Sequence, residues 1–461
     1  MPGHQSVRAA ISAKSPGAQL RLSAGLRWVV MLALLGGGGG LLAALVPGAP
    51  NADAFAWFGW ADELVQGRLD TDVMRTSWKA LTVMASIPLL ALGRDNVAFA
   101  FTALTAASWL GMAVVAFRLG VRLAGRTAGI IAAAGALCPT NALTRVAAGR
   151  AEPLSALLIM ISVERGLAGR AGASYAASCA AVLGRAEFWP LIIMYGLALG
   201  RQRKLSWKVV GAGQVAVTGL LFGADWIGSG DPFHASVVAR LNGESGSGLA
   251  AALLESVTQL PIALMVAAVA GGVLAARRRD SGVLVVALVA IACAVVALAL
   301  LVPGYAVLDR FFWPFAGLMA VLAGYSLAGL SRYRRHHLGA VVVIGVLVAG
   351  ASLVEVGIRT TQSLRLARGA ARLDHHFVVA IAHSSASSAL RAGGEVRTVT
   401  ATNELAWRLG VPIGRIGPPA SGHPKTPAVY FLRRGYPIPA EAHDAITTFR
   451  VGAWRVVERQ P

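Results

Sequence analysis

Long apolar segments separated by short basic loops are the feature that most constrains the fold of this chain. Of its 461 residues, 56% are hydrophobic and only 14% are charged, and the mean hydropathy is +0.62. A helical run of about 20 apolar residues matches the hydrocarbon thickness of a bilayer. A transmembrane β-barrel would instead alternate apolar and polar residues. The pattern therefore predicts an all-α polytopic membrane protein in the plasma membrane.

About eleven transmembrane helices are predicted, after a polar, basic N-terminal tail at 1–27. The expected spans are 28–48, 96–117, 127–140, 151–168, 174–186, 187–200, 206–223, 249–276, 282–302, 312–331 and 338–357. The apolar segment 80–93 is short for a span and contains Pro88, so we interpret it as a re-entrant or interfacial piece. The two short segments at 174–200 could also form one broken pair that meets near Arg185 and Glu187.

The distribution of positive charge predicts the orientation of the chain. Clusters of Arg and Lys occur at 118–126, 165–170, 201–208, 277–279 and 332–335. If 80–93 does not cross, every cluster lies on the same side as the basic N-terminus, which the positive-inside rule places in the cytoplasm. This explains the net charge of +20 without a nucleic-acid partner. The abundance of Ala, Gly and Arg is typical of a high-GC bacterium, so the opposite face is expected to be periplasmic.

The first span contains an unusual glycine run, and the cysteines are few. The run Gly36–Gly40 favours close approach of a neighbouring helix. The three cysteines are Cys138, Cys179 and Cys293, and all lie inside apolar segments. We interpret them as small core residues, and not as a disulfide framework or a metal site.

Composition divides the chain into three parts. The tail at 1–27 is followed by a transmembrane domain at 28–357, whose first outer loop is 49–95. Residues 358–461 are more polar and are predicted to form a linker and a small α/β domain on the extracytoplasmic side. Strands are expected at 397–402, 428–432 and 449–457, and a short helix at 403–410. His375 and His376 are expected to lie in the linker.

The segment after the first span carries both aromatic residues and carboxylates. Within 51–66, Phe55, Trp57, Phe58 and Trp60 repeat at helical spacing, which predicts an amphipathic helix at the membrane surface. Asp53 lies at the start of this helix, near the lipid headgroups. A residue there can meet a lipid-borne and a water-borne substrate together, although a solvated loop would explain an isolated Asp equally well.

Other ionisable residues also gather in the predicted outer loops. They include Asp62, Glu63, Lys79, Arg145, Arg150, Glu152, Arg185, Glu187, Asp225, Asp231, His234, Asp309 and Arg310. Such residues are costly in lipid and usually face a cavity or a partner. For Arg150 with Glu152, and for Arg185 with Glu187, a structural ion pair is an equally good interpretation. The sequence has no P-loop, GxGxxG or HExxH motif, which disfavours an ATP-driven or nucleotide-sugar-dependent mechanism.

Over about residues 25–335 this layout resembles the GT-C superfamily of integral-membrane glycosyltransferases, and most of all its actinobacterial members. The superfamily includes protein O-mannosyltransferases and aminoarabinose transferases. Asp53 occupies the place of its acidic residue after the first span. The stretch Thr76-Ser-Trp-Lys-Ala-Leu is similar to its His/Lys-Pro-Pro-Leu element, with Ala80 in place of proline. Residues 122–129 are similar to its inner-loop RLFGRRAG pattern, and 302–314 to its RYLLP-like start of a late span.

The resemblance implies transfer of a sugar from a polyprenyl-phosphate carrier to an acceptor hydroxyl on the extracytoplasmic face, with inversion. Asp53 would be the general base. Lys79 and Arg310 would hold the lipid phosphate, with Arg150 and Arg185 as further candidates in the same cavity.

Three residues compete for the second acidic position of the superfamily, namely Asp62, Glu152 and Glu187. The resemblance therefore leaves the involvement of a divalent cation open, and no other cofactor is expected. It also leaves open which sugar is moved and whether the acceptor is a cell-envelope glycan, a lipid or a protein.

Two other classes of protein fit the same charged loops. A transporter or lipid-linked sugar flippase could use an outer cavity and a broken helix pair, but the hydropathy shows no internal repeat and the polar residues lie on one face. A membrane scaffold with a working outer domain is the third class. It predicts that Asp53 and Lys79 can be replaced without effect.

Overall fold

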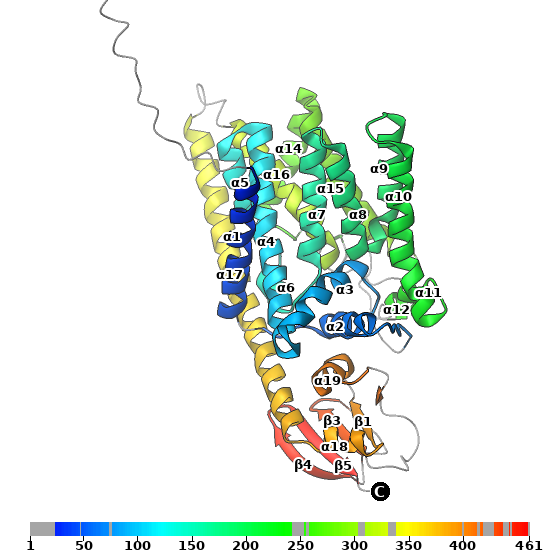
Figure 1. Cartoon of the computed structure of the whole chain (residues 1–461). Coiled ribbons are helices and arrows are strands. Elements are labelled where there is room, and N and C mark those ends of the chain that lie inside the picture. Colours follow the sequence, from blue (N-terminus) through cyan, green and yellow to red (C-terminus); the bar gives the residue numbers. More distant parts are fainter. Residues whose placement is uncertain are drawn as a thin grey trace, which may run out of the picture.

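The computed structural model shows a bundle of helices with a small sheet at one end (Figure 1). The structure describes residues 24–46, 48–72, 76–241, 253–254, 258–302, 309–330, 338–398, 401–412, 415–417, 428–436, 442 and 445–459. The predicted all-α membrane domain and the small C-terminal α/β domain are both present among these residues.

The bundle is built from apolar helices packed around α16. Its helices are α1 (Ala24–Leu45), α4 (Arg94–Ala124), α5 (Arg126–Ala136), α7 (Glu152–Leu167), α8 (Ala171–Gly184), α9 (Trp189–Arg201), α10 (Trp207–Thr218), α14 (Ile262–Arg278), α15 (Ser281–Ala299), α16 (Trp313–Leu330) and α17 (Leu338–Ala382). Helix α16 packs against α4, α5, α7, α14 and α15. Its side chains from Phe315 to Ala323 are buried almost throughout, so it forms the centre of the bundle.

Three helical segments in the described part of the chain are long and apolar enough to cross a membrane. They are Arg94–Ala124, Trp207–Ser229 and Ser281–Ala299. Shorter apolar helices occupy Val29–Leu45, Ala80–Leu92, Ala171–Gly184 and Trp313–Gly329. The count of about eleven spans remains a prediction.

Short elements gather at the end of the bundle that lies nearest the sheet (Figure 1). They are α2 (Ala52–Val65), α3 (Ala80–Ser86), η1 (Ile87–Leu92), α6 (Ala142–Ala147), α11 (Ala224–Ser229) and α12 (His234–Leu241). The segment 80–93 thus forms helices of 7 and 6 residues, which are too short to cross a core of about 30 Å. Helix α8 ends at Gly184, and a short 3-10 turn, η2 (Ala186–Phe188), joins it to α9.

The C-terminal domain is a five-stranded mixed sheet with two short helices. Its elements are α18 (Ala386–Arg391), β1 (Glu395–Thr398), α19 (Thr402–Leu409), β2 (Ile416–Gly417), β3 (Ala428–Arg433), β4 (Ile446–Val451) and β5 (Trp454–Arg459). The strand order is β2-β1-β3-β5-β4, with β1 parallel to β2 and β3 and the other pairs antiparallel. The helix predicted at 403–410 is confirmed by α19. The single strand predicted at 449–457 is wrong, because the chain turns at Gly452, whose φ is +56°, to form the β4–β5 hairpin.

The first part of the predicted linker, from residue 358, is helical. Helix α17 has 45 residues and runs without a break from the bundle to the sheet. His375 and His376 therefore lie in this helix. Phe377 explains why the helix continues, because its ring stacks on Trp454 of β5 at 4.2 Å between centroids. Burial of this apolar face stabilises the C-terminal part of α17 as a helix, which its polar composition alone would not indicate.

A cluster of charged residues also fastens α19 to α17. Arg408 on α19 contacts Asp374 on α17 at 2.6 Å and Glu404 at 2.8 Å. Burial, together with a hydrogen bond to Asp374, raises the pKa of Glu404 to about 8, although the charge of Arg408 opposes the rise. A single guanidinium thus contacts both carboxylates and links the two helices.

The aromatic helix α2 is confirmed, but its surroundings differ from those expected. Phe55, Trp57, Phe58 and Trp60 are at most 1% exposed. They pack against α4 and against α19 of the C-terminal domain, which covers the helix from the side opposite the bundle (Figure 1). The rings thus form a core between the two domains. The prediction that they face the lipid headgroups is therefore wrong.

The predicted role of the glycine run is confirmed where α1 crosses α4. A Cβ on Gly39 would lie 2.4 Å from the carbonyl oxygen of Ala103, whereas a Cβ on Gly36 would meet nothing within 4 Å. We expect Gly39→Ala to destabilise the fold by about 1–3 kcal/mol, because the helices must separate. Thermal unfolding in detergent measures this loss, with Gly36→Ala as the matched control. Equal melting temperatures of the two variants would contradict the prediction.

Candidate active site

Asp53 lies in the first turn of α2, at the junction of the bundle and the C-terminal domain. Asn51 caps this helix, since its side-chain oxygen accepts a hydrogen bond from the backbone N–H of Ala54 at 3.0 Å. The helix N-terminus favours a carboxylate at this position. The cap and the helix direction together fix where the Asp53 side chain lies.

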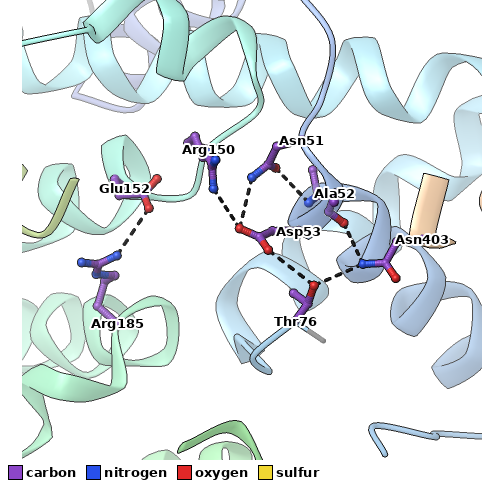
Figure 2. Close-up of polar contacts among 9 residues, drawn as sticks. Asn51, Ala52, Asp53, Thr76, Arg150, Glu152, Arg185 and Asn403 are labelled. Carbon is purple, nitrogen blue, oxygen red and sulfur yellow. Dashed lines mark hydrogen bonds and ion pairs between the residues drawn. The ribbon is translucent and has the colours of Figure 1, made fainter. Parts of the chain in front are cut away.

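At least three donors surround the Asp53 carboxylate (Figure 2). Arg150 Nη1 donates to Oδ2 at 2.8 Å, and Asn51 Nδ2 donates to the same oxygen at 3.1 Å. The Thr76 hydroxyl lies 3.4 Å from Oδ1. The Asp53 side chain is still 29% exposed. The group is therefore held in place and remains open to a reactant.

Three residues of this site, Asn51, Thr76 and Asn403, are not among the predicted site residues. Asn51 and Thr76 belong to stretches that the sequence singles out, whereas Asn403 lies in α19 of the C-terminal domain. Asn403 Nδ2 donates to Thr76 Oγ1 and to the carbonyl oxygen of Ala52, both at 3.1 Å (Figure 2). No local sequence pattern marks Asn403, because more than 300 residues separate it from Asp53 along the chain.

Lys79 lies at the N-terminal boundary of α3 and close to the aromatic helix. Its Nζ is 5.2 Å from the ring centroid of Trp57, within the range of a cation–π interaction. The same loop that carries Thr76 thus carries Lys79 past the N-terminal half of α2. The side chain is half-buried, so its charge is only partly screened by solvent.

Arg185 forms the centre of a buried ionic group at the break between α8 and α9. Its Nη1 is 3.4 Å from Glu152 Oε1, and its Nε is 2.6 Å from Glu187 Oε1 (Figure 2 draws the Glu152 pair). Its guanidinium also lies over the Phe311 ring at 4.1 Å. Among the residues that the structure describes, none accepts a hydrogen bond from Nη2, although this atom is buried. Of the two predicted pairs, Arg185 with Glu187 is confirmed. Arg185 also bonds Glu152, and Arg150 bonds Asp53.

Asp62 lies apart from this group, although it belongs to the same helix as Asp53. Nine residues separate them, roughly 13 Å along a helix axis. Asp62 pairs with Arg94 at 2.5 Å and lines a polar cavity of about 50 Å³ between α2, α4 and α19. Glu63 lines the same cavity. Burial raises the pKa of Glu63, although the backbone N–H of Asp70 partly offsets the rise.

The remaining predictions concern Arg310 and a divalent cation. Arg310 lies in η4 (Asp309–Phe312), and its side chain is outside the part of the chain that the structure describes. Within the described residues, no three His, Cys, Asp or Glu side chains come together as ligands for a metal ion. Two of the competing acidic residues, Glu152 and Glu187, are already engaged by Arg185.

A bundle of helices with a small α/β domain over one end is a fold that this chain shares with solved structures of ArnT. The chain is similar in structure to ArnT from Cupriavidus metallidurans in the apo state. The match has a TM-score of 0.59 at 14% identity and covers 95% of this chain and 98% of ArnT. ArnT bound to undecaprenyl phosphate matches with a TM-score of 0.57 at 13% identity, covering 94% of this chain and 98% of ArnT. No family model and no curated protein matches the sequence.

Proposed function

We propose that this chain is a membrane glycosyltransferase that moves a sugar from a polyprenyl-phosphate carrier to an acceptor hydroxyl. The observation that carries the proposal is the Asp53 carboxylate, held by Arg150 and Asn51 at the junction of two domains in a chain with the ArnT fold. The solved ArnT complex with undecaprenyl phosphate supports a polyprenyl-phosphate donor.

In this proposal Asp53 is the general base. It takes the proton of the acceptor hydroxyl while the acceptor oxygen attacks the anomeric carbon. The bond from that carbon to the phosphate oxygen breaks, and the polyprenyl phosphate leaves with the electron pair. Arg150 occupies Oδ2, so we assign the proton to Oδ1, which has the longer contact. A single displacement of this kind inverts the anomeric configuration.

Positive side chains would stabilise the departing phosphate. Lys79 and Arg185 lie on elements at the same end of the bundle, and Arg310 immediately precedes Phe311, whose ring contacts Arg185. Charge-assisted hydrogen bonds to phosphate are stronger than neutral ones, especially where water is excluded. The buried Nη2 of Arg185 is a donor suited to this task.

We further propose that the N-terminus is cytoplasmic and that the C-terminal domain is extracytoplasmic. The support is the predicted placement of the basic loops on the side of the N-terminus. The elements that carry Asp53 and Lys79 lie at the end of the bundle nearest the C-terminal domain (Figure 1). Donor and acceptor would then meet at the extracytoplasmic surface of the plasma membrane.

Sugar transfer by the purified protein in proteoliposomes tests this function. The donors are radiolabelled undecaprenyl-phosphate mannose, arabinose, galactose and aminoarabinose, and a cell-envelope fraction supplies acceptors. We expect a new glycosidic bond of inverted configuration, identified by NMR of the product, together with release of undecaprenyl phosphate. Movement of a lipid-linked sugar across the bilayer with no new glycosidic bond would contradict the proposal and favour the flippase alternative.

Replacement of Lys79 tests its assigned contact with the donor phosphate. We expect Lys79→Met to raise KM for the donor roughly 10-fold or more, because one charged hydrogen bond contributes about 1.5–3 kcal/mol. Lys79→Arg keeps the charge near Trp57, so we expect its KM for the donor to lie between those of Lys79→Met and wild type. Transfer kinetics over a donor concentration series measure both. An unchanged KM for Lys79→Met would remove Lys79 from the site.

A further inference from the structure

The C-terminal domain reaches the proposed catalytic carboxylate through α19. This helix packs on α2, where the Trp407 and Phe58 rings lie 5.6 Å apart between centroids. Asn403, in the first turn of α19, is 8% exposed, and Thr76 is 6% exposed. A domain that only bound an acceptor would not need a buried polar contact at this point.

The orientation of the Asn403 amide follows from its neighbours. The carbonyl oxygen of Ala52 can only accept a hydrogen bond, so the amide nitrogen, and not the amide oxygen, must face it. That nitrogen has two hydrogens, and its second neighbour at 3.1 Å is Thr76 Oγ1. Asn403 is therefore a donor to both groups.

This donor determines where the Thr76 proton points. A hydroxyl has one hydrogen, and its oxygen here already accepts from Asn403. The hydrogen is left for Asp53 Oδ1 at 3.4 Å. This distance is longer than that of an ordinary hydroxyl–carboxylate hydrogen bond, and such contacts in enzymes without substrate commonly shorten in the reactive complex.

We propose that Asn403 is a positioning residue, which orients the Thr76 hydroxyl toward Asp53 and so makes the C-terminal domain part of the catalytic site. The inference rests on the proposed role of Asp53 as the base. Correct placement of the base depends on contacts of this kind, since small errors in its position slow the reaction. Release of the C-terminal domain from α2 would then switch off the chemistry as well as any contact with an acceptor.

A double-mutant cycle with Thr76→Val and Asn403→Ala tests the inference in the full-length protein. The assay uses proteoliposomes and the undecaprenyl-phosphate sugar that gives product. We expect each single variant to lower kcat roughly 10-fold, with KM for the donor within about twofold of wild type. The double variant is expected to be no slower than either single one, because Asn403 acts through Thr76. Thr76→Ser keeps a hydroxyl at this position, so we expect its kcat to stay within about twofold of wild type.

The matched control is Thr361→Val, on the exposed side of α17, where the hydroxyl bonds only the carbonyl oxygen of Gly357 among the contacts described. If the losses in kcat of the two single variants multiply in the double variant, the two residues act independently. This result would overturn the inference and leave Asn403 as a contact that only docks the C-terminal domain. Wild-type kcat in both single variants, together with an inactive Asp53→Asn, would also overturn it while the proposed function stands. An active Asp53→Asn would remove the proposed base and the inference with it.

Discussion

Asp53→Asn is expected to lower the rate of sugar transfer by about 10²–10⁴-fold, the usual contribution of a positioned general base. Asn keeps the size of the side chain and its place in the first turn of α2, but an amide cannot take the acceptor proton. Because Asp53 is partly exposed, its ion pair with Arg150 contributes little to stability, and we expect the variant to fold. Initial rates in proteoliposomes, at equal amounts of inserted protein, measure the effect.

The matched control is Asp62→Asn. Asp62 is also a carboxylate on α2 with a partly exposed arginine partner, and its side chain is 28% exposed. It lies on the far side of the helix from the proposed base, so we expect transfer within about twofold of wild type. Equal rates for wild type and Asp53→Asn would contradict the assigned base. A similar loss in both variants would point to a structural role of α2 carboxylates instead.

Arg185→Met is expected to have the largest effect on stability, a loss of about 3–5 kcal/mol in the free energy of unfolding. The reason is that Arg185 and Glu152 are only 4% and 2% exposed at their side chains. Removal of the guanidinium leaves buried carboxylates without their described cation. The melting temperature of the detergent-solubilised protein measures the loss, which addition of undecaprenyl phosphate should not restore.

Arg118→Met serves as the control for Arg185→Met. Arg118 is 38% exposed, and its partner Glu164 keeps a second contact, with Arg165 at 3.1 Å. We therefore expect a change of at most about 1 kcal/mol. Comparable losses in the two variants would show that burial does not distinguish these ion pairs. A stable Arg185→Met protein with a raised KM for the donor would instead make Arg185 a pure substrate ligand.

The sequence predicted the bundle because hydrophobic patterning is a local property. Apolar runs identified the regions of α4, α15 and α16, and the aromatic spacing identified α2. Proline and short length correctly indicated that 80–93 forms short elements. Helix boundaries were less accurate. The continuation of α17 as far as Ala382 depends on Phe377 packing on Trp454, a contact between distant parts of the chain.

The candidate site, like the fold, was predictable in part from the sequence and in part only from the tertiary structure. By itself, the sequence determined the class of fold, the place of Asp53 after the first span and the set of charged residues near it, since each follows from local order and composition. Only the tertiary structure decided the partners: Arg150 with Asp53, Arg185 with Glu152, and Asn403 with Thr76. Hydrogen bonds and ion pairs act over about 3 Å, and the positions that they join are set by the packing of helices that are remote in sequence.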